Sequence, residues 1–351
     1  MRKFITKIIR FFLIGTIPFF IIVLLYVYFD PFKVLYEYES FYKTDAKARV
    51  TLNQDYVSTT TFIKNNTDVV YNSFILGNSR SIFYQISDWK KHLGENARCY
   101  HFDASGEALW ALNKKIEFID KQGNIIENML LVLDYATLIQ DKPKSGHLFI
   151  ISPALVDNSN IIEFHKTFFS AFLTPKFLYA FIDYKISNRI KPYMKKGSLL
   201  DDRKQNYDNK TNELRFDYFE DLISKGKYYT PERLSVFYGR DTTIQSYSQE
   251  CIKWNQKLLL ENISSILLKH NTKLRVIINP LYDQKKLNKT DLQYLTTLFG
   301  NENVFDFSGK NSFTNDYTNY YESSHYRPHV AREIMEIIYK DKARTHNTLY
   351  K

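Results

Sequence analysis

Five short apolar segments, each ending in polar residues, constrain the fold of this chain more than any other feature. Their length and composition predict β-strands at 73–76, 98–102, 129–133, 274–279 and 303–307. Helical spacing of apolar residues occurs at 81–93, 108–121, 246–270, 289–299 and 329–341. Because strands alternate with helices, the pattern predicts an α/β fold, in which a parallel sheet lies in an open, flavodoxin-like three-layer α/β/α sandwich.

The first expected strand leads directly into the turn Gly77-Asn78-Ser79. Apolar residues then recur at three- and four-residue spacing, at Ile82, Phe83, Ile86, Trp89 and Leu93. This order places Ser79 at the carboxyl edge of the sheet beside a helix N-terminus, whose unpaired N–H groups stabilise an anion. Serine is also a preferred N-cap residue, so a structural role is the alternative.

An acid and a base for a serine occur near the other end of the chain. His325 follows Glu322 by three positions, and Pro328 then suits the first turn of a helix. On a loop before that helix, the Glu322 carboxylate can reach Nδ1 of His325 and leave Nε2 free to accept a proton from a serine hydroxyl. An ordinary surface pair on an aromatic-rich loop is the alternative.

These blocks, in this order, resemble those of the SGNH/GDSL hydrolase superfamily. Gly77-Asn78-Ser79 matches the nucleophile block, and Glu322-Ser323-Ser324-His325 matches the last Asp-x-x-His block with Glu in place of Asp. Ser105-Gly106-Glu107, after the second strand, looks like the block whose glycine N–H helps to form the oxyanion hole. The resemblance implies that Ser79 is the nucleophile, His325 its base and Glu322 the residue that orients the base.

One block of the family differs in this chain. Where the family carries an Asn that donates to the oxyanion, Asp134 follows the third strand, and an ionised carboxylate cannot donate a hydrogen bond. Asp134 could instead orient a substrate, or hold a turn by accepting backbone N–H groups. Asn279, after the fourth strand, is a candidate for the missing donor, with strand termination as the alternative. Together with Gly106 and Asn78, these residues form the candidate oxyanion and substrate positions.

The amino terminus combines basic residues with a long apolar run. Arg2, Lys3, Lys7 and Arg10 precede the uncharged segment 11–29, and about 19 apolar residues match the thickness of a bilayer's hydrocarbon core. No small-residue cleavage site follows the run, as it would in a signal peptide. We therefore expect a signal-anchor transmembrane helix within residues 1–30, with a cytoplasmic N-terminus and the rest of the chain outside.

The remainder is expected to comprise a juxtamembrane lead-in at 31–68 and one α/β domain at 69–345. Strand–helix alternation breaks between the third and fourth strands, where an aromatic-rich insertion spans about 146–240. An insertion at the strand-end edge could serve as a lid or a substrate platform. Packing of its aromatic side chains within a small helical subdomain is the alternative.

The composition argues against several other classes of protein. The eight histidines are scattered without zinc-site spacing, and the eleven glycines form neither a phosphate loop nor a dinucleotide fingerprint, so we expect no metal and no cofactor. Two cysteines, Cys99 and Cys251, do not make a disulfide framework. The net charge of +10 is spread without a basic block of the nucleic-acid-binding kind, and it favours anionic lipid or acidic glycan as a partner.

Within the superfamily, the chain looks most like membrane-anchored envelope members that add or remove acyl groups, as in alginate acetylation or teichoic-acid D-alanylation. The resemblance implies an extracytoplasmic serine esterase or O-acyltransferase acting on a cell-envelope polysaccharide or polymer. In the transferase case, a multispanning membrane acyltransferase is the expected partner. The competing expectation is a catalytically inactive envelope factor of the same fold that binds glycan or such a partner. The Glu322 replacement and the missing Asn favour this second expectation.

Overall fold

The structure is a computed structural model that describes residues 2–42, 49–195, 199–202, 206–241 and 243–347. In the two terminal helices, the side chains of residues 2–3, 8–14 and 341–347 lie outside the description. The chain divides into two compact units. The N-terminal unit combines Met1–Leu52 with Asn160–Asp202, and the sheet unit combines Asn53–Ser159 with Arg203–Lys351. The segments expected as lead-in (31–68) and insertion (146–240) are therefore each divided between the two units.

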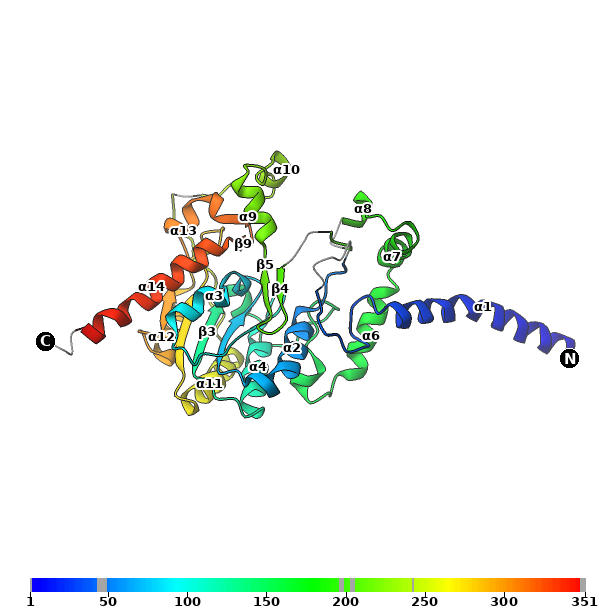
Figure 1. Cartoon of the computed structure of the whole chain (residues 1–351), viewed down its shortest axis with the longest axis horizontal. Helices are drawn as coiled ribbons and strands as arrows, with labels where there is room; N and C mark the ends of the chain where they lie inside the picture. The colour runs from blue at the N-terminus through cyan, green and yellow to red at the C-terminus, as the bar shows by residue number, and fades with distance from the viewer. Residues whose placement is uncertain (1, 43–48, 196–198, 203–205, 242, 348–351) are drawn as a thin grey trace. The chain divides into compact units, whose positions relative to one another are not determined.

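The sheet unit contains a five-stranded, fully parallel sheet (Figure 1). In spatial order its strands are β2 (Cys99–Asp103), β1 (Ser73–Gly77), β3 (Asn128–Leu133), β6 (Lys273–Ile278) and β7 (Val304–Asp306). All five lie where the apolar segments predict them. Because the chain adds β2 and β3 on opposite sides of β1, the strand order reverses there, and sheets of this kind bind ligands outside the carboxyl ends of the strands at that point.

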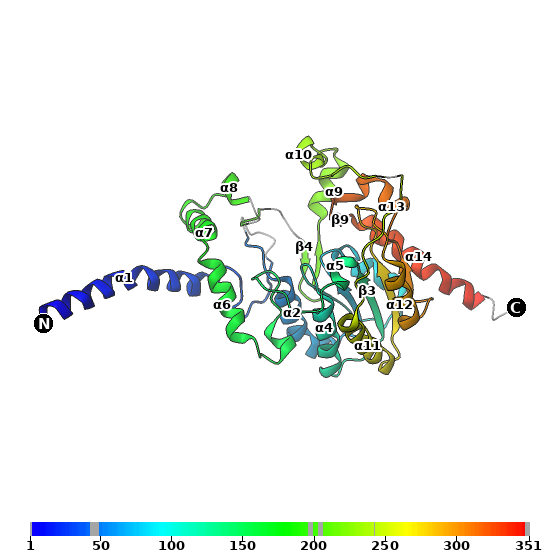
Figure 2. The same ribbon diagram turned by 180° about the vertical axis from the view of Figure 1, so that it is seen from behind.

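Helices cover both faces of the sheet. On one face, seen from behind in Figure 2, a core containing Phe74, Leu131 and Val276 is covered by α2 (Gln54–Val69), α4 (Leu109–Lys121), α11 (Trp254–Lys269) and α12 (Lys289–Phe299). The opposite core, containing Ile75 and Leu130, packs against α3 (Ile86–Trp89) and α14 (Pro328–Asn347). Alternate residues of a strand point to opposite faces, so fully apolar strands supply both cores. The predicted α/β class with a parallel sheet is confirmed, and the arrangement is compatible with a three-layer sandwich.

The prediction of one helix at 81–93 is wrong. That segment forms the 3-10 turn η1 (Ser81–Phe83), the single-turn α3 and a second 3-10 turn, η2 (Lys90–His92). Gln85 is extended between η1 and α3, and the Ile86 N–H donates to the Glu213 carboxylate. A tertiary contact thus takes the place of helical continuation, and Ser79 precedes one short turn rather than a long helix. The helix expected to begin at 246 begins later, at Trp254.

The other elements of the sheet unit are short. They are α5 (Tyr135–Leu138), η3 (Pro153–Val156), β4 (Asn206–Asp208), β5 (Glu213–Arg215), α9 (Asp217–Ser224), α10 (Pro231–Leu234), α13 (Ser312–Asn315), η5 (Tyr317–Asn319), β8 (Tyr320–Glu322) and β9 (His325–Tyr326). The antiparallel hairpin β4–β5 lies beside β2, because the His101 N–H donates to the Thr211 carbonyl at 2.9 Å. The hairpin β8–β9 precedes α14 and carries His325.

The N-terminal unit contains α1 (Arg2–Phe29), α6 (Ile161–Phe172), α7 (Pro175–Ser187) and α8 (Pro192–Lys195). Aromatic rings hold these helices together. The Tyr26 ring lies 5.2 Å from both Phe169 and Phe172, and Phe32 stacks on Phe177 with ring centroids 4.9 Å apart. Edge-to-face and offset contacts between aromatic rings contribute free energy beyond that of the apolar area they bury. The phenylalanines of α6 and α7 therefore pack a helical unit with the end of α1.

Among the described residues, no helix is long and apolar enough to span a membrane. The expected span at 11–29 includes side chains of residues 11–14, which lie outside the description.

Candidate active site

Ser79 is held at the carboxyl end of β1 by a closely packed turn. A Cβ atom at Gly77 would lie 2.7 Å from the Val132 carbonyl oxygen and 2.9 Å from Ser81 Cβ, so only glycine fits between β1 and β3 at this position. The Ser81 N–H donates to the Asn78 carbonyl at 2.8 Å and closes the turn. Ser79 is left partly exposed at the edge of the sheet.

His325 meets Ser79 from the other end of the chain. Ser79 Oγ lies 2.8 Å from Nε2 of His325, and Nδ1 of His325 is hydrogen-bonded to Oε1 of Glu322. Glu322 and His325 are opposite each other across the β8–β9 hairpin, and the other Glu322 oxygen accepts the Ser324 N–H at 2.7 Å. Burial acts to raise the pKa of the Glu322 carboxyl, but the hydrogen bond and charge of His325 outweigh it and hold the pKa below its usual value. The three predicted catalytic residues thus form a connected acid–base–hydroxyl chain.

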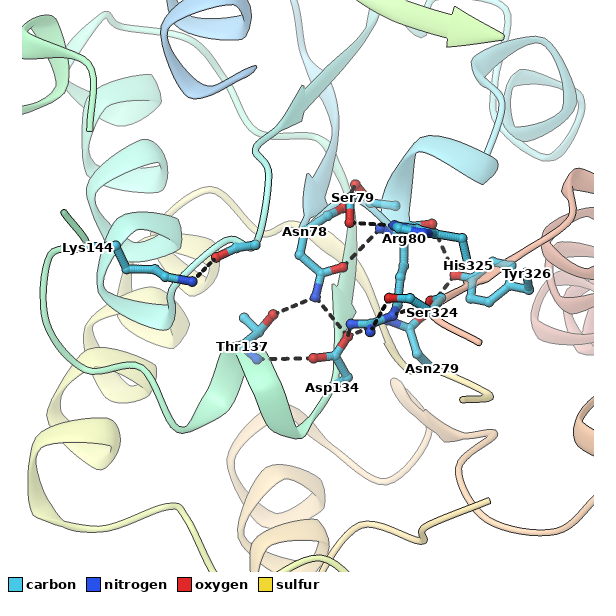
Figure 3. A network of polar contacts seen from close by, with 12 residues as sticks. Asn78, Ser79, Arg80, Asp134, Thr137, Lys144, Asn279, Ser324, His325 and Tyr326 are labelled. Carbon is cyan, nitrogen blue, oxygen red and sulfur yellow. Dashed lines mark hydrogen bonds and ion pairs between the residues drawn. The ribbon is translucent and has the colours of Figure 1, made fainter. Parts of the chain in front are cut away.

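Arg80 fixes the loop that carries His325 (Figure 3). Its guanidinium donates through Nε to the Ser324 carbonyl at 2.8 Å, through Nη2 to Ser324 Oγ at 3.0 Å and through Nη1 to Asp134 Oδ2 at 2.8 Å. The planar fork of arginine presents these donors in a fixed geometry. Because Arg80 follows Ser79 directly, one side chain ties the nucleophile turn to the histidine loop.

Asp134 is the centre of a buried network beneath the Ser79 turn rather than a residue facing an oxyanion. Its Oδ2 accepts from Asn78 Nδ2 at 2.8 Å and from Asn279 Nδ2 at 3.1 Å, in addition to Arg80, and its Oδ1 accepts the Thr137 N–H at 3.0 Å (Figure 3). Burial tends to raise the pKa of this carboxyl, but the Arg80 charge and the amide donors lower it below its usual value. An ionised Asp134 therefore holds a local turn, which is one of the two roles expected for it.

The side-chain amides of Asn78 and Asn279 are both committed to this network. Asn78 Nδ2 donates to Asp134 and, at 3.0 Å, to Thr137 Oγ1, while its Oδ1 accepts the Arg80 N–H. Asn279 Oδ1 accepts from the Tyr326 hydroxyl at 2.8 Å. Both residues are buried. They position the site. Asn279 Nδ2 donates one of its two protons to Asp134 and the side chain is fully buried, so this arrangement gives no support to the expected use of Asn279 as an oxyanion donor.

Two backbone N–H groups of the predicted blocks remain available as donors. Among the described residues, no hydrogen bond is found from the N–H of Ser79 or from that of Gly106, and both residues are partly exposed. The loop carrying Gly106 is tied to the Ser79 turn by the Ala104 N–H, which donates to the Gly77 carbonyl at 3.3 Å. Gly106 has φ +55°, and a Cβ there would lie 3.2 Å from Lys144 Nζ. Glycine therefore suits this position for both its conformation and its close neighbour.

A buried cluster of charged side chains holds the loop that carries Gly106. Lys115, fully buried, donates to Glu107 Oε2 at 2.5 Å and to the Asp103 carbonyl at 2.9 Å, and it lies 3.3 Å from Asp55 Oδ2. Burial raises the pKa of Glu107 to about 7 against the opposing effect of Lys115. The cluster fixes the loop that begins at the end of β2 to helices α2 and α4.

The structure brings Ser79, Glu322 and His325 together, places Asn78, Asp134 and Asn279 in the adjoining network, and puts Gly106 on a neighbouring loop. The sequence reasoning missed Arg80, Ser324 and the buried Tyr326, whose hydroxyl also lies 3.2 Å from the Arg80 carbonyl. A signal for them was present: Arg80 directly follows the serine, and Tyr326 directly follows the histidine. In the part of the chain that was searched, no group of three or more His, Cys, Asp or Glu side chains is arranged to hold a metal ion.

The site resembles a serine hydrolase centre in its geometry alone. No family model matches this chain, and neither a curated protein nor a solved structure matches it.

Proposed function

We propose that the protein is a serine acyl esterase or O-acyltransferase that uses Ser79, His325 and Glu322. The observation that carries the proposal is the hydrogen-bonded chain from Ser79 Oγ through both nitrogens of His325 to Glu322. A serine hydroxyl is a weak nucleophile unless an adjacent base removes its proton, and a base held by a carboxylate is the arrangement that does so. The partial exposure of Ser79 and His325 leaves the serine open to a substrate.

The proposed reaction has two steps. In the first, Ser79 Oγ attacks the carbonyl carbon of an ester while Nε2 of His325 takes the hydroxyl proton, and the tetrahedral oxyanion is held by the N–H groups of Ser79 and Gly106. Collapse of this intermediate breaks the ester bond, and His325 returns the proton to the leaving alkoxide. In the second step, water or a sugar hydroxyl attacks the acyl-serine by the same route. Water gives an esterase and a sugar hydroxyl gives a transferase.

The wider assignment is to an SGNH-like, flavodoxin-like fold at the cell envelope. It is supported by the strand order, which is 2-1-3-4-5 when the five strands are numbered along the chain, and by the Ser79 turn after the first of them. Anchoring by residues 1–30 with an extracytoplasmic sheet unit, and action on a surface polysaccharide or polymer, belong to the proposal. The basic residues before the apolar run support that orientation. A multispanning membrane acyltransferase is the proposed partner if the reaction is a transfer.

A second candidate function is a catalytically inactive factor that binds glycan or that partner. One observation favours it: Asp134 occupies the place of the expected Asn, and the side-chain amides of Asn78 and Asn279 are buried and donate to Asp134. In this case the oxyanion hole would consist of two backbone N–H groups only. Loss of one oxyanion donor lowers the kcat of an enzyme by about 10²–10³-fold. A site without the Asn donor would therefore be either a slow enzyme or an inactive one.

A fluorophosphonate probe distinguishes the two functions, because it forms a covalent bond only with an activated serine. We expect the full-length protein to be labelled and Ser79→Ala to remain unlabelled, with Ser81→Ala as the matched control that keeps its labelling. Absence of labelling in the folded wild-type protein would refute catalysis and leave the binding function.

A further inference from the structure

The N-terminal unit contains a cavity of about 280 Å³ just after α1. Its walls come from three segments: the chain following Phe29, residues near Leu52, and the end of α7 with Leu200. All of these belong to one unit. The cavity is therefore a property of this unit, and none of its lining residues belongs to the Ser79 site.

One side of the cavity is apolar. Phe41, Leu52, Phe181 and Leu200 line it and are buried, and the ring of Phe181 lies 5.7 Å from that of Phe29. Aromatic and aliphatic walls of this kind accept hydrocarbon, because burying each methylene contributes about 0.8 kcal/mol. A purely polar ligand would leave this wall unused.

The charged groups lining the cavity are predominantly cationic. The lining includes three cations, Lys33, Arg49 and Lys185, and one carboxylate, Asp30. The Asp30 carboxylate accepts the N–H groups of Val34, Leu35 and Tyr36 and the Tyr38 hydroxyl, so its charge is already stabilised within its own turn. Arg49 is paired with Asp201 at 3.2 Å.

Lys185 is the cation best placed for a ligand. Its Nζ lies 4.2 Å from the centroid of the Phe29 ring and 5.1 Å from that of Phe181, and no ion pair from it to a carboxylate is found within the described ranges. Ammonium groups over aromatic faces gain about 0.5–2 kcal/mol and keep their remaining donors for another partner. Lys185 is an exposed residue, and partial desolvation of its ammonium lowers the pKa, an effect that a bound anion would offset. An apolar wall beside an uncompensated cation recognises an anion joined to a hydrocarbon chain.

The exposed surface next to the cavity indicates that such a molecule would come from a membrane. In the last turns of α1, Leu24, Val27 and Tyr28 are 66%, 42% and 79% exposed. Exposed apolar side chains adjoining a cavity are typical of surfaces that face lipid or a partner. We propose that this cavity binds an anionic membrane phospholipid, with its phosphate at Lys185 and the start of its acyl chain against Phe181 and Leu200. This inference rests on the membrane attachment included in the proposed function.

The test uses the full-length chain in a neutral detergent, with binding measured by native mass spectrometry. The ligands are dioctanoyl-phosphatidylglycerol, dioctanoyl-phosphatidylcholine and glycerol phosphate, which has the anionic head without the chains. We expect phosphatidylglycerol to bind at least about fivefold more tightly than phosphatidylcholine, as one favourable charge contact requires, and glycerol phosphate not to compete with it. Competition by glycerol phosphate at equal concentration would mean a soluble phosphate ligand and would overturn the lipid assignment.

Three variants locate the site. Lys185→Gln should weaken phosphatidylglycerol binding about fivefold and leave phosphatidylcholine unchanged, while Lys185→Arg should restore it. Lys176→Gln, on the exposed first turn of the same helix, is the matched control and should bind like the wild type. Equal affinity for the two lipids, or wild-type binding by Lys185→Gln, would refute the proposal. Labelling of Ser79 by the fluorophosphonate probe, measured in the same samples, shows separately whether the serine chemistry fails.

Discussion

Ser79 and Ser81, two positions apart in the sheet unit, are each hydrogen-bonded to a histidine, and only one of the two pairs has the surroundings that the proposed catalysis requires. Ser79 Oγ is 2.8 Å from Nε2 of His325, and Ser81 Oγ is 3.0 Å from Nε2 of His101. By distance alone the pairs are nearly equivalent. Their surroundings differ in three respects: which residue of the pair donates the proton, what the second ring nitrogen bonds to, and whether the serine is accessible to a substrate.

In the buried pair, Ser81 and His101, the histidine donates the proton of the hydrogen bond and cannot accept one from the serine. The Ser81 hydroxyl donates its single proton to the Asn78 carbonyl at 2.8 Å, so His101 must donate from Nε2 to Ser81 Oγ. His101 Nδ1 then has no hydrogen-bond partner among the described residues, and burial lowers the pKa of this imidazole to about 3. His101 is therefore a hydrogen-bond donor that stiffens the turn and not a base.

The exposed pair has what the buried pair lacks. Glu322 accepts from Nδ1 of His325, which leaves Nε2 as the acceptor for Ser79, and both residues of the pair are partly exposed. The comparison teaches that a serine–histidine hydrogen bond is insufficient evidence of a nucleophile. The carboxylate behind the ring and access to the hydroxyl decide its role.

The largest expected effect separates the two serines. Ser79→Ala and His325→Ala should each lower kcat/KM for p-nitrophenyl acetate by about 10⁴-fold or more, and the double variant should be scarcely worse than either, because the two residues act in one step. Ser81→Ala should cost less than about tenfold, since it removes only a hydrogen bond that supports the turn. Additive losses from Ser79→Ala and His325→Ala would contradict a shared step.

Removing the carboxylate charge hydrogen-bonded to the His325 ring should have the next largest effect. Glu322→Gln should lower kcat by about 10³-fold, because a neutral amide stabilises the developing imidazolium less and holds the tautomer less firmly. The melting temperature should change little, since Glu322 is about one-third exposed. A variant with wild-type kcat would mean that His325 does not depend on Glu322, and the contrast with His101 would lose its main support.

Arg80 is expected to act as a positioning residue. Arg80→Ala releases Ser324 and the histidine loop, and a small displacement of a base costs about 10² in rate, so kcat should fall by that factor with little change in KM. Arg80→Lys should recover stability but only part of kcat, because lysine lacks the fork that reaches both Ser324 and Asp134. The control is Arg98→Ala, which removes an arginine whose side chain, among the residues described, donates only to backbone carbonyls. Equal effects of the two alanine variants on kcat would contradict a specific role of Arg80.

The smallest expected effect concerns stability and pH. The pKa of Asp134 is lowered in the folded protein, so its carboxylate stabilises the fold above the unfolded-state pKa of about 3.9, and this contribution is lost as the pH falls toward the folded-state pKa. Asp134→Asn should therefore be less stable than the wild type by about 3 kcal/mol at neutral pH, because it leaves Arg80 without its carboxylate. The difference should shrink below about pH 4, as measured by urea unfolding. A difference that is constant with pH would show that Asp134 is not an ionised partner of Arg80.

Much of the sheet could be predicted because its strands are short apolar runs that end in polar residues. The pairing of Ser79 with His325 could also be predicted, since the order of the blocks and the strand edge together place both residues. Hydrogen bonds between residues far apart in the sequence could not be predicted in this way. Neither the Arg80 fork nor the direction of the Ser81 proton follows from residue spacing.

The errors have physical causes as well. The spacing of Ile82, Phe83, Ile86 and Trp89 fits a helix, but contacts with Glu213 and Tyr326 favour a break between η1 and the contiguous turns α3 and η2. Helix α2 was not predicted, because its run of threonines has low helix propensity. It is stabilised instead by an Asn53 N-cap and by burial of Val57 and Phe62. Packing of α6 and α7 with α1 joins residues more than 100 positions apart, which no local pattern reports.

Mapping of the serine that reacts with the fluorophosphonate probe tests the central claim most directly. The wild-type protein, Ser81→Ala and His325→Ala are labelled, digested and analysed by peptide mass. We predict one adduct, on Ser79, with a labelling rate lowered less than about tenfold in Ser81→Ala and by about 10³-fold or more in His325→Ala. An adduct on Ser81, or labelling of Ser79 that is independent of His325, would contradict the account.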